Sequence, residues 1–237
     1  MNTIAFDTAS DIFSIGLSTE CRRYCFSAEG GQKHSELIMD GADILLRSAG
    51  IERTALEAVV CMQGPGSFTG LRIGFSAAKG LALALDIPII PIPTLDCMAY
   101  PFSFWPGIVL PVIDARKNAF FTALYSQGKR LSEYLDIEIE ALIRTIAATL
   151  AQHNQNSSVA SLLVTGPASF MVKNALSEAF SDTAINCTFR QGYAAELLNI
   201  AAEKGIFKKT SADFSVGPLY LRKSDAELTE NMDSSNV

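Results

Sequence analysis

The sequence predicts an α/β fold of two similar lobes that face each other across a cleft. The chain opens with two apolar segments, 3–7 and 12–18, separated by a polar turn, as in an antiparallel hairpin. Asp7 and its neighbours reappear around Asp114, at an offset of 107 residues, where a second hairpin follows. Residues 64–68 (Gly-Pro-Gly-Ser-Phe) reappear as 166–170 (Gly-Pro-Ala-Ser-Phe), at an offset of 102. We therefore infer an internal duplication.

The elements of the first half follow from hydrophobic periodicity and from capping residues. Ser35 is a good N-cap and Gly50 a good stop, which places the first long helix between them. Pro101 ends the short helix that begins near Thr94. In order, we expect strands at 3–7, 12–18 and 22–27, a helix at 35–49, a strand at 58–62, a helix at 67–85, a strand at 87–92 and a helix at 94–100.

A hairpin followed by helix crossovers, repeated once, is typical of the actin and sugar-kinase architecture. We expect residues 1–104 to form an N-terminal lobe and residues 105–222 a C-terminal lobe of this type. The acidic residues 223–237 contain few apolar side chains, so we expect a flexible tail.

Charge and composition exclude several classes of function. The 237 residues include 19 Lys and Arg against 25 Asp and Glu, a net charge of -6, so nucleic acid is not bound by a dominant basic surface. His34 and His153 are the only histidines and no cysteine pair has CxxC spacing, so we expect neither a metal nor a cofactor. Charges and prolines interrupt the apolar stretch 75–93, and the start lacks a basic leader region. We expect a cytoplasmic protein without a membrane span.

The turn at 64–69 is the first candidate binding site, because backbone N–H groups and hydroxyls at the start of a helix favour an anion. The possible anion or nucleotide contacts are Asp7, Thr8, Gly64, Gly66, Ser67 and Thr69. The alternative is a tight strand-to-helix turn in which Ser67 is only the N-cap. Likewise, Asp7 and Asp114 either hold a hydrated metal ion in the cleft or only order their hairpins by accepting nearby backbone N–H groups.

Two helices carry more apolar surface than one sheet face requires. On the helix at 35–49 the apolar positions cover an arc of about 220°, and the helix at 67–85 leaves only a narrow polar strip. Small residues on the second helix allow another helix to approach closely. We expect a partner interface formed by Ile38, Met39, Ala42, Leu45, Leu46, Gly70, Gly74, Ala77 and Ala78. The alternative is that both faces are buried within the chain.

The run Gly-Pro-Gly-Ser-Phe-Thr-Gly-Leu-Arg-Ile-Gly at 64–74, followed by Ala-Lys-Gly-Leu-Ala at 78–82, resembles the signature of the TsaB (YeaZ) family. Supporting matches are Asp7-Thr8, His34-Ser35-Glu36, Ile113-Asp114-Ala115-Arg116 and Tyr220-Leu221-Arg222. The resemblance covers nearly the whole chain in order. It implies the duplicated two-lobed fold and a relationship to TsaD, the catalytic subunit that makes N6-threonylcarbamoyladenosine in tRNA.

The resemblance also implies that this chain is not the enzyme. In the catalytic relative two histidines at the corresponding helix bind the active-site metal, and Thr94 and Met98 stand at those positions here. The implied function is a non-catalytic scaffold and activator that pairs with a TsaD-like subunit through the helices of its N-terminal lobe. A TsaE-like P-loop ATPase joins this assembly, and tRNA is met only through the complex. Without its partner, the same surface would form a homodimer.

Two enzyme hypotheses remain open beside this one. The first is a nucleotide-dependent phosphotransferase that uses Asp7, Asp114 and the 64–69 loop, and ATP turnover lost in Asp7→Ala would favour it. The second is a metallopeptidase. Stoichiometric zinc or iron in the purified chain would favour it, whereas the presence of only two histidines in the sequence argues against it.

Overall fold

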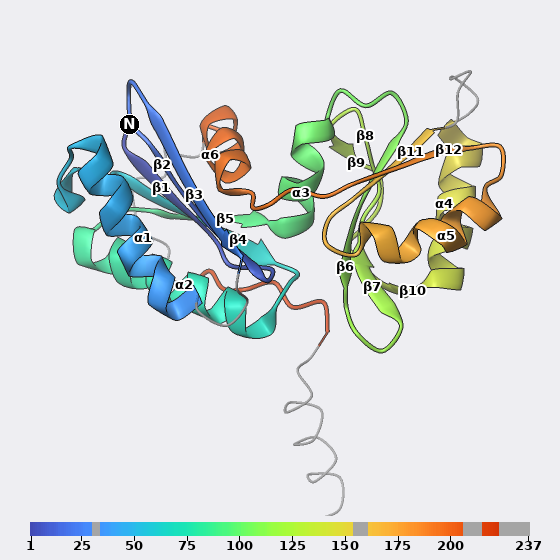
Figure 1. The fold of residues 1–237 in the computed structure, drawn as a ribbon, viewed down its shortest axis with the longest axis horizontal. Coiled ribbons are helices and arrows are strands. Elements are labelled where there is room, and N and C mark those ends of the chain that lie inside the picture. Colours follow the sequence, from blue (N-terminus) through green and yellow to red (C-terminus); the bar gives the residue numbers. More distant parts are fainter. Residues whose placement is uncertain (30–33, 154–160, 206–214, 223–237) are drawn as a thin grey trace, which may run out of the picture.

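The computed structural model describes residues 1–29, 34–153, 161–205 and 215–222, which form two α/β lobes side by side (Figure 1). The first lobe contains strands β1 (Thr3–Asp7), β2 (Ile12–Ser18), β3 (Arg23–Glu29), β4 (Ala58–Gly64) and β5 (Ile89–Pro93) and helices α1 (His34–Ala49), α2 (Phe68–Leu85) and α3 (Thr94–Ala99). The second contains β6 (Ile108–Asp114), β7 (Ala119–Thr122), β8 (Tyr125–Ser126), β9 (Lys129–Arg130), β10 (Leu135–Glu138), α4 (Ile139–His153), β11 (Ser161–Thr165), α5 (Ser169–Ala179) and β12 (Ala184–Thr188). Helix α6 (Ala194–Glu203) comes last.

The two sheets have the same topology, which confirms the predicted duplication and fold class. The first sheet has the order β3-β2-β1-β4-β5 and the second β10-β7-β6-β11-β12, with the small β8–β9 hairpin added beside β6. Strand β1 pairs antiparallel with β2 and parallel with β4, and in the same way β6 pairs antiparallel with β7 and parallel with β11. The predicted elements of the first half are found within one or two residues of their expected ends.

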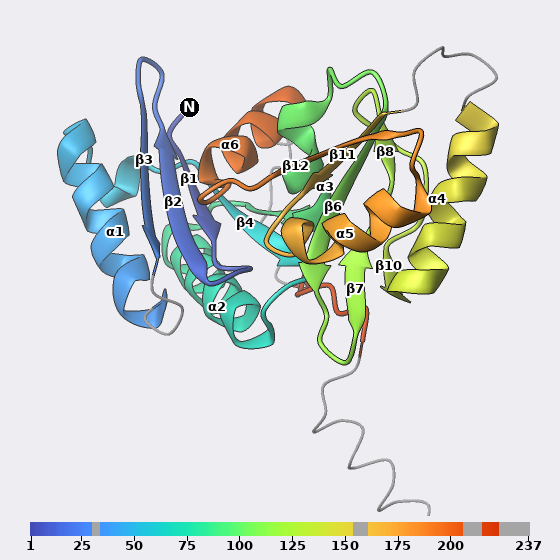
Figure 2. The same ribbon diagram turned by 45° about the vertical axis from the view of Figure 1, so that its right-hand side comes forward.

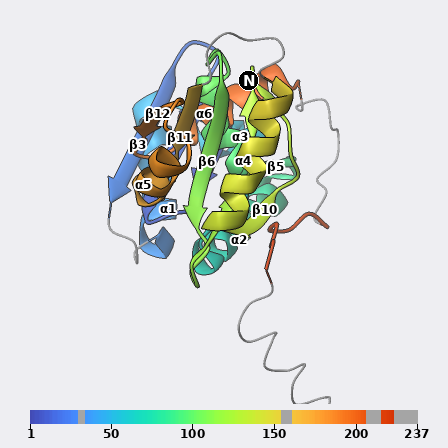
Figure 3. The same cartoon turned by 90° about the vertical axis from the view of Figure 1, so that its right-hand side faces the viewer.

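The helices form layers on the outer faces of the two sheets. Helices α1 and α2 pack on the first sheet through a core of Ile4, Phe6, Phe13, Ile15, Ile38, Leu45 and Phe75. Helices α4 and α5 lie in front of the second sheet when the molecule is viewed from the side of its second lobe (Figure 3), and they share a core with Leu110 that includes Leu142 and Val172. Each lobe therefore has its own hydrophobic core between its sheet and its outer helices.

The inner faces of the two sheets share a third core, which includes α3 and α6 (Figure 2). Helix α6 follows β12 of the second lobe but packs on β1 and β2 of the first. Its buried residues Leu197, Leu198 and Ala201 cover the inner face of the first sheet. We predicted that residues 105–222 form the C-terminal lobe. Helix α6 belongs to that range in sequence but packs on the sheet of the first lobe.

None of the helices in the described ranges is both long and apolar enough to span a bilayer.

Candidate functional site

The turn after β1 is ordered by Asp7, which is almost completely buried at the lobe junction. Its carboxylate accepts the Ala9 N–H at 3.2 Å, the Ser14 hydroxyl at 3.2 Å and the Tyr193 N–H at 3.0 Å. Burial raises the pKa of Asp7 from 3.8 to about 6, although these hydrogen bonds favour the charged form. Asp7 therefore joins the first hairpin to α6 and is not presented to solvent.

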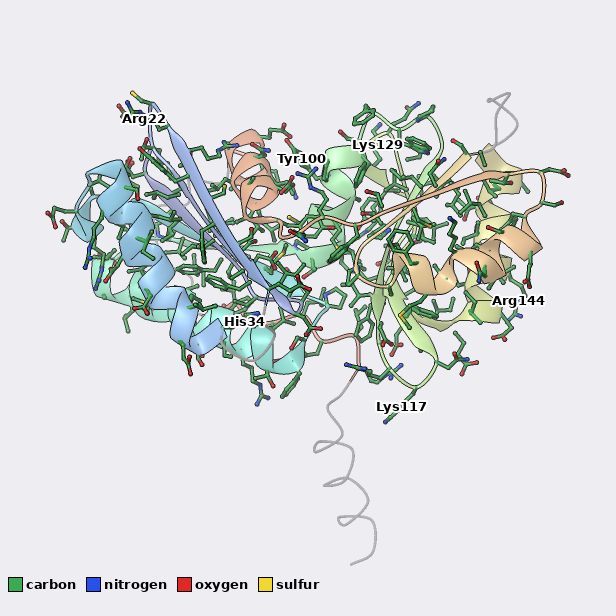
Figure 4. All side chains as sticks on the ribbon, viewed as in Figure 1. Arg22, His34, Tyr100, Lys117, Lys129 and Arg144 are labelled. Carbon is green, nitrogen blue, oxygen red and sulfur yellow. The ribbon has the colours of Figure 1, made fainter. Side chains whose placement is uncertain are left out.

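Asp114 plays the equivalent local role after β6. Its Oδ1 accepts the Arg116 N–H at 2.7 Å. Arg116, Lys117 and Asn118, which follow Ala115, all have positive φ, as in a tight turn at the tip of this hairpin. Lys117 projects from that tip in Figure 4. Both aspartates thus accept the backbone N–H two residues further on and order their hairpins, as expected if they have a structural role rather than hold a metal ion.

The loop between β4 and α2 packs tightly against neighbouring backbone. Gly64 has a φ of +111°, and a Cβ there would lie 2.5 Å from the carbonyl oxygen of Leu219. The Ser67 side chain accepts the Gly70 N–H at 3.2 Å and is the N-cap of α2, while the Ser67 N–H donates to the Ala9 carbonyl at 2.8 Å. The Ser67 hydroxyl and N–H are thus already hydrogen-bonded within the chain, which weakens the case for an anion-binding site at this turn.

A cleft of about 690 Å³ separates the tips of the two hairpins. It is lined by residues 9–11 and 65–68 of the first lobe, by 113–117, Phe121, Pro167 and Met171 of the second, and by 219–222. The residues predicted to contact an anion do not all lie at one site. Gly66 and Ser67 line the cleft and Thr69 lines another groove, whereas Asp7 and Thr8 are buried. An anion or nucleotide at this cleft stays a prediction.

Thr94 and Met98, which the sequence resemblance sets at the positions of metal-binding histidines, are enclosed. Thr94 is 0% exposed and Met98 is 2% exposed. The Thr94 hydroxyl accepts the Gly64 N–H at 3.1 Å and so supports the β4–α2 loop. Over the described part of the chain, no group of three or more His, Cys, Asp or Glu side chains is placed to hold a metal ion.

The predicted interface residues require a correction, because most of them pack inside the chain. The buried members of the set are Ile38, Ala42, Leu45, Leu46, Gly70, Gly74 and Ala78, while Ala77 is half-buried and only Met39 is exposed. A Cβ at Gly70 would lie 2.0 Å from the Thr8 carbonyl oxygen, so the small residues of α2 let this helix pack against the first hairpin. Burial within the chain fits these seven residues, although Ile38 also lines a groove on the surface.

An exposed groove nevertheless lies where α1 and α2 meet. It has a volume of about 540 Å³ and is lined by Ser35, Ile38, Phe68, Thr69, Arg72, Ile73 and Ser76. We call it the α1–α2 groove. Exposed apolar side chains on the same two helices are Met39 (40% exposed), Ile44 (54%) and Leu83 (69%). Sequence reasoning singled out neither Phe68 nor Arg72 as a site residue.

Comparison with known proteins agrees with this architecture. A family model described as TsaD, tRNA N6-adenosine threonylcarbamoyltransferase, matches residues 27–229. The chain is 33% identical over 136 residues to the tRNA threonylcarbamoyladenosine biosynthesis protein TsaB of Bacillus subtilis, covering 56% of this chain and 58% of that protein. The Escherichia coli protein of the same name is 33% identical over 131 residues, covering 54% and 57%. The chain thus spans less than two thirds of the length of these curated relatives.

Two solved structures from Pseudomonas aeruginosa have the same fold. The one described as YeaZ has a TM-score of 0.70 at 20% identity, covering 92% of this chain and 100% of that one. The other, described as similar to peptidase YEAZ, has a TM-score of 0.71 at 21% identity, covering 93% and 99%. An inorganic polyphosphate/ATP-glucomannokinase from Arthrobacter reaches 0.50 at 13% identity, covering 85% and 99%, which supports the kinase-like fold class. The chain belongs to the TsaD family that the matching model describes, and the relatives that it resembles in sequence and in fold are TsaB (YeaZ) proteins.

Proposed function

We propose that this chain serves tRNA N6-threonylcarbamoyladenosine biosynthesis as a non-catalytic subunit that docks on a TsaD-like catalytic subunit. The names of its curated relatives support the pathway. The observation that carries the non-catalytic role is the enclosure of Thr94 and Met98, which replace the metal-binding histidines implied for the catalytic relative. A hydroxyl already bonded to backbone and a buried thioether are poor ligands for a hard or borderline metal ion.

The α1–α2 groove is the docking surface in this proposal. Phe68 and Ile73 line it, and the exposed Met39 lies on the adjoining turns of α1. Covering apolar side chains that water otherwise contacts favours association, and a helix of a sister subunit with the same fold matches a groove between two helices. In the absence of that partner, the same surface on two copies of the chain would pair to form a symmetric homodimer.

The remaining partners follow from the same assembly. A TsaE-like P-loop ATPase joins the complex, and tRNA is bound by the complex rather than by this chain alone. The net charge of -6 supports this division, because binding of an isolated tRNA requires neutralisation of several phosphates.

Co-purification with the TsaD-like subunit tests the proposal, and Ser76→Arg provides the decisive variant. Ser76 is exposed and lines the groove, so a bulky cation there blocks docking without entering the core. Ser177→Arg is the matched control, because Ser177 is equally an exposed serine on α5 of the other lobe. We expect Ser76→Arg to lose partner binding and tRNA modification, and Ser177→Arg to retain both. Unchanged binding by a folded Ser76→Arg variant would show that the groove is not the interface.

The phosphotransferase hypothesis retains one supporting observation, the cleft between the lobes, whose volume of about 690 Å³ suits a nucleotide. Against it, the Asp7 carboxylate is buried and accepts three hydrogen bonds within the chain. Asp114 lines this cleft, so ATP turnover by the purified chain that disappears in Asp114→Ala would favour the enzyme over the accessory subunit.

A further inference from the structure

The segment 215–222 runs between the lower ends of the two lobes (Figures 1 and 2), and we call residues 219–222 the strap. The strap begins on the first lobe. The Leu219 N–H donates to the Gln63 carbonyl at 2.7 Å, near the end of β4. The Leu219 carbonyl lies so close to Gly64 that no side chain fits there. This end of the strap is therefore fixed by backbone contacts to the β4–α2 loop.

The far end of the strap is anchored on the second lobe by Arg222. Its Nε donates to Asp136 Oδ2 at 2.7 Å, and a second guanidinium nitrogen donates to Oδ1 at 2.5 Å. A third nitrogen donates to the Ala115 carbonyl at 3.1 Å, directly after β6. The Asp136 and Arg222 side chains are only 20% and 29% exposed, so this two-pronged pair is partly shielded from solvent.

Between its ends, the strap contacts two residues of the α1–α2 groove. The Tyr220 ring lies 5.0 Å from the Phe68 ring, measured between centroids. The Arg72 Nε donates to the Tyr220 hydroxyl at 3.3 Å, and the Arg72 guanidinium lies 3.9 Å above the Phe68 ring. A partner seated in the groove would contact the same Phe68 and Arg72 side chains that hold Tyr220.

The strap lies across the cleft from the other links between the lobes. Helices α3 and α6 join the lobes at the upper side in Figure 1. There, Asp96 of α3 accepts the hydroxyls of Tyr125 and Tyr134 at 2.7 and 2.9 Å. With Leu219 held to the first lobe, a rotation of the lobes that opened the cleft about this side would pull Arg222 from Asp136 or draw Tyr220 away from Phe68.

We propose that the strap holds the lobes closed in the free chain, and that occupation of the α1–α2 groove releases Tyr220 and lets the cleft open. The second part of this inference rests on the proposed function, because it requires a partner in the groove. Docking on one lobe thereby changes the position of the other lobe, through side chains that belong to both the groove and the strap. In the proposed non-catalytic subunit, this coupling would alter the relative position of the two lobes.

Distances between spin labels on the two lobes test the first part with the full chain. Labels at Glu29→Cys and Lys173→Cys, exposed positions on β3 and α5, report the opening when Cys21, Cys25 and Cys187 are replaced by serine. We expect Arg222→Ala to shift the distances to longer values and to broaden them. Arg144→Ala, an exposed arginine of α4, is the matched control and leaves them unchanged. The exchange Arg222→Asp with Asp136→Arg restores the wild-type distances at least in part.

Addition of the TsaD-like subunit tests the second part. We expect the wild-type distances to lengthen toward those of Arg222→Ala, and Ser76→Arg, which cannot dock, to stay closed. Wild-type distances in Arg222→Ala would overturn the strap as the element that holds the lobes. Partner binding without any change of distance would overturn the coupling alone. Absence of partner binding to the wild-type chain would refute the proposed function, while the comparison in the free chain would still decide whether the strap closes the cleft.

Discussion

Removal of the Asp7 charge tests whether this carboxylate is a buried structural link between the hairpin and α6. Its pKa is raised from 3.8 to about 6, because burial disfavours the charged form more than three hydrogen bonds favour it. The folded chain therefore binds the Asp7 proton more tightly than the unfolded chain. The contribution of Asp7 to the free energy of unfolding is thus fully present below about pH 4 and is lost as the pH rises through about 6.

These two pKa values set the size of the effect. Between about pH 7.5 and about pH 5, Asp7 alone should raise the free energy of unfolding by roughly 1.4 kcal/mol. Asp7→Asn keeps the shape of the side chain but cannot titrate in this range, so this part of the pH dependence should disappear. The readout is the difference between the two pH values, because the amide also alters hydrogen bonds to Ser14 and Tyr193 at every pH.

Urea unfolding of both proteins at the two pH values measures this difference. Asp114→Asn is the matched control, since it removes the equivalent carboxylate of the second lobe, whose side chain is 34% exposed, and leaves Asp7 in place. It should retain the pH dependence of the wild-type chain. An Asp7→Asn variant that folds and keeps the full wild-type difference would refute the assignment of a raised pKa to Asp7.

Two further predictions concern the packing of α2 and of the β4–α2 loop. Gly70→Ala should destabilise the chain by about 3 kcal/mol, because its Cβ would lie 2.0 Å from the Thr8 carbonyl oxygen. Gly80→Ala on the same helix meets nothing within 4 Å and should stabilise it by about 0.5–1 kcal/mol, so equal effects of the two variants in thermal unfolding would contradict the packing described. Thr94→Val leaves a buried backbone N–H without an acceptor and should cost about 1–3 kcal/mol, whereas Thr94→Ser should cost much less. Similar melting temperatures for the valine and serine variants would show that the hydroxyl does not support the loop.

The fold was predictable because its signals are local and repeated. The apolar segments at 3–7 and 12–18, the N-cap at Ser67 and the glycine after the first long helix each determine a short segment without reference to the rest. The repetition of Asp7 at Asp114 then extends the first half to the second. The common topology of the two sheets shows that this local information was sufficient for the fold class.

The surface residues were not predictable to the same degree. An arc of apolar residues on a helix shows how much of it avoids water, but not whether its own sheet or another molecule covers it. Ala42 and Gly74 fitted both readings in sequence, and the first hairpin covers Gly74 while the first-sheet core encloses Ala42. The link between Arg222 and Asp136 spans 86 residues, and no periodicity reports such a contact.

The position of α6 has a consequence for synthesis on the ribosome. Because residues 194–203 cover the inner face of a sheet built from residues 3–93, that sheet is translated long before its covering helix. The nascent first half therefore exposes an apolar sheet face for about a hundred residues of further elongation, at a stage when unpaired apolar surface attracts chaperones and other chains. Native packing of the first half is completed only when residues 194–203 have been made.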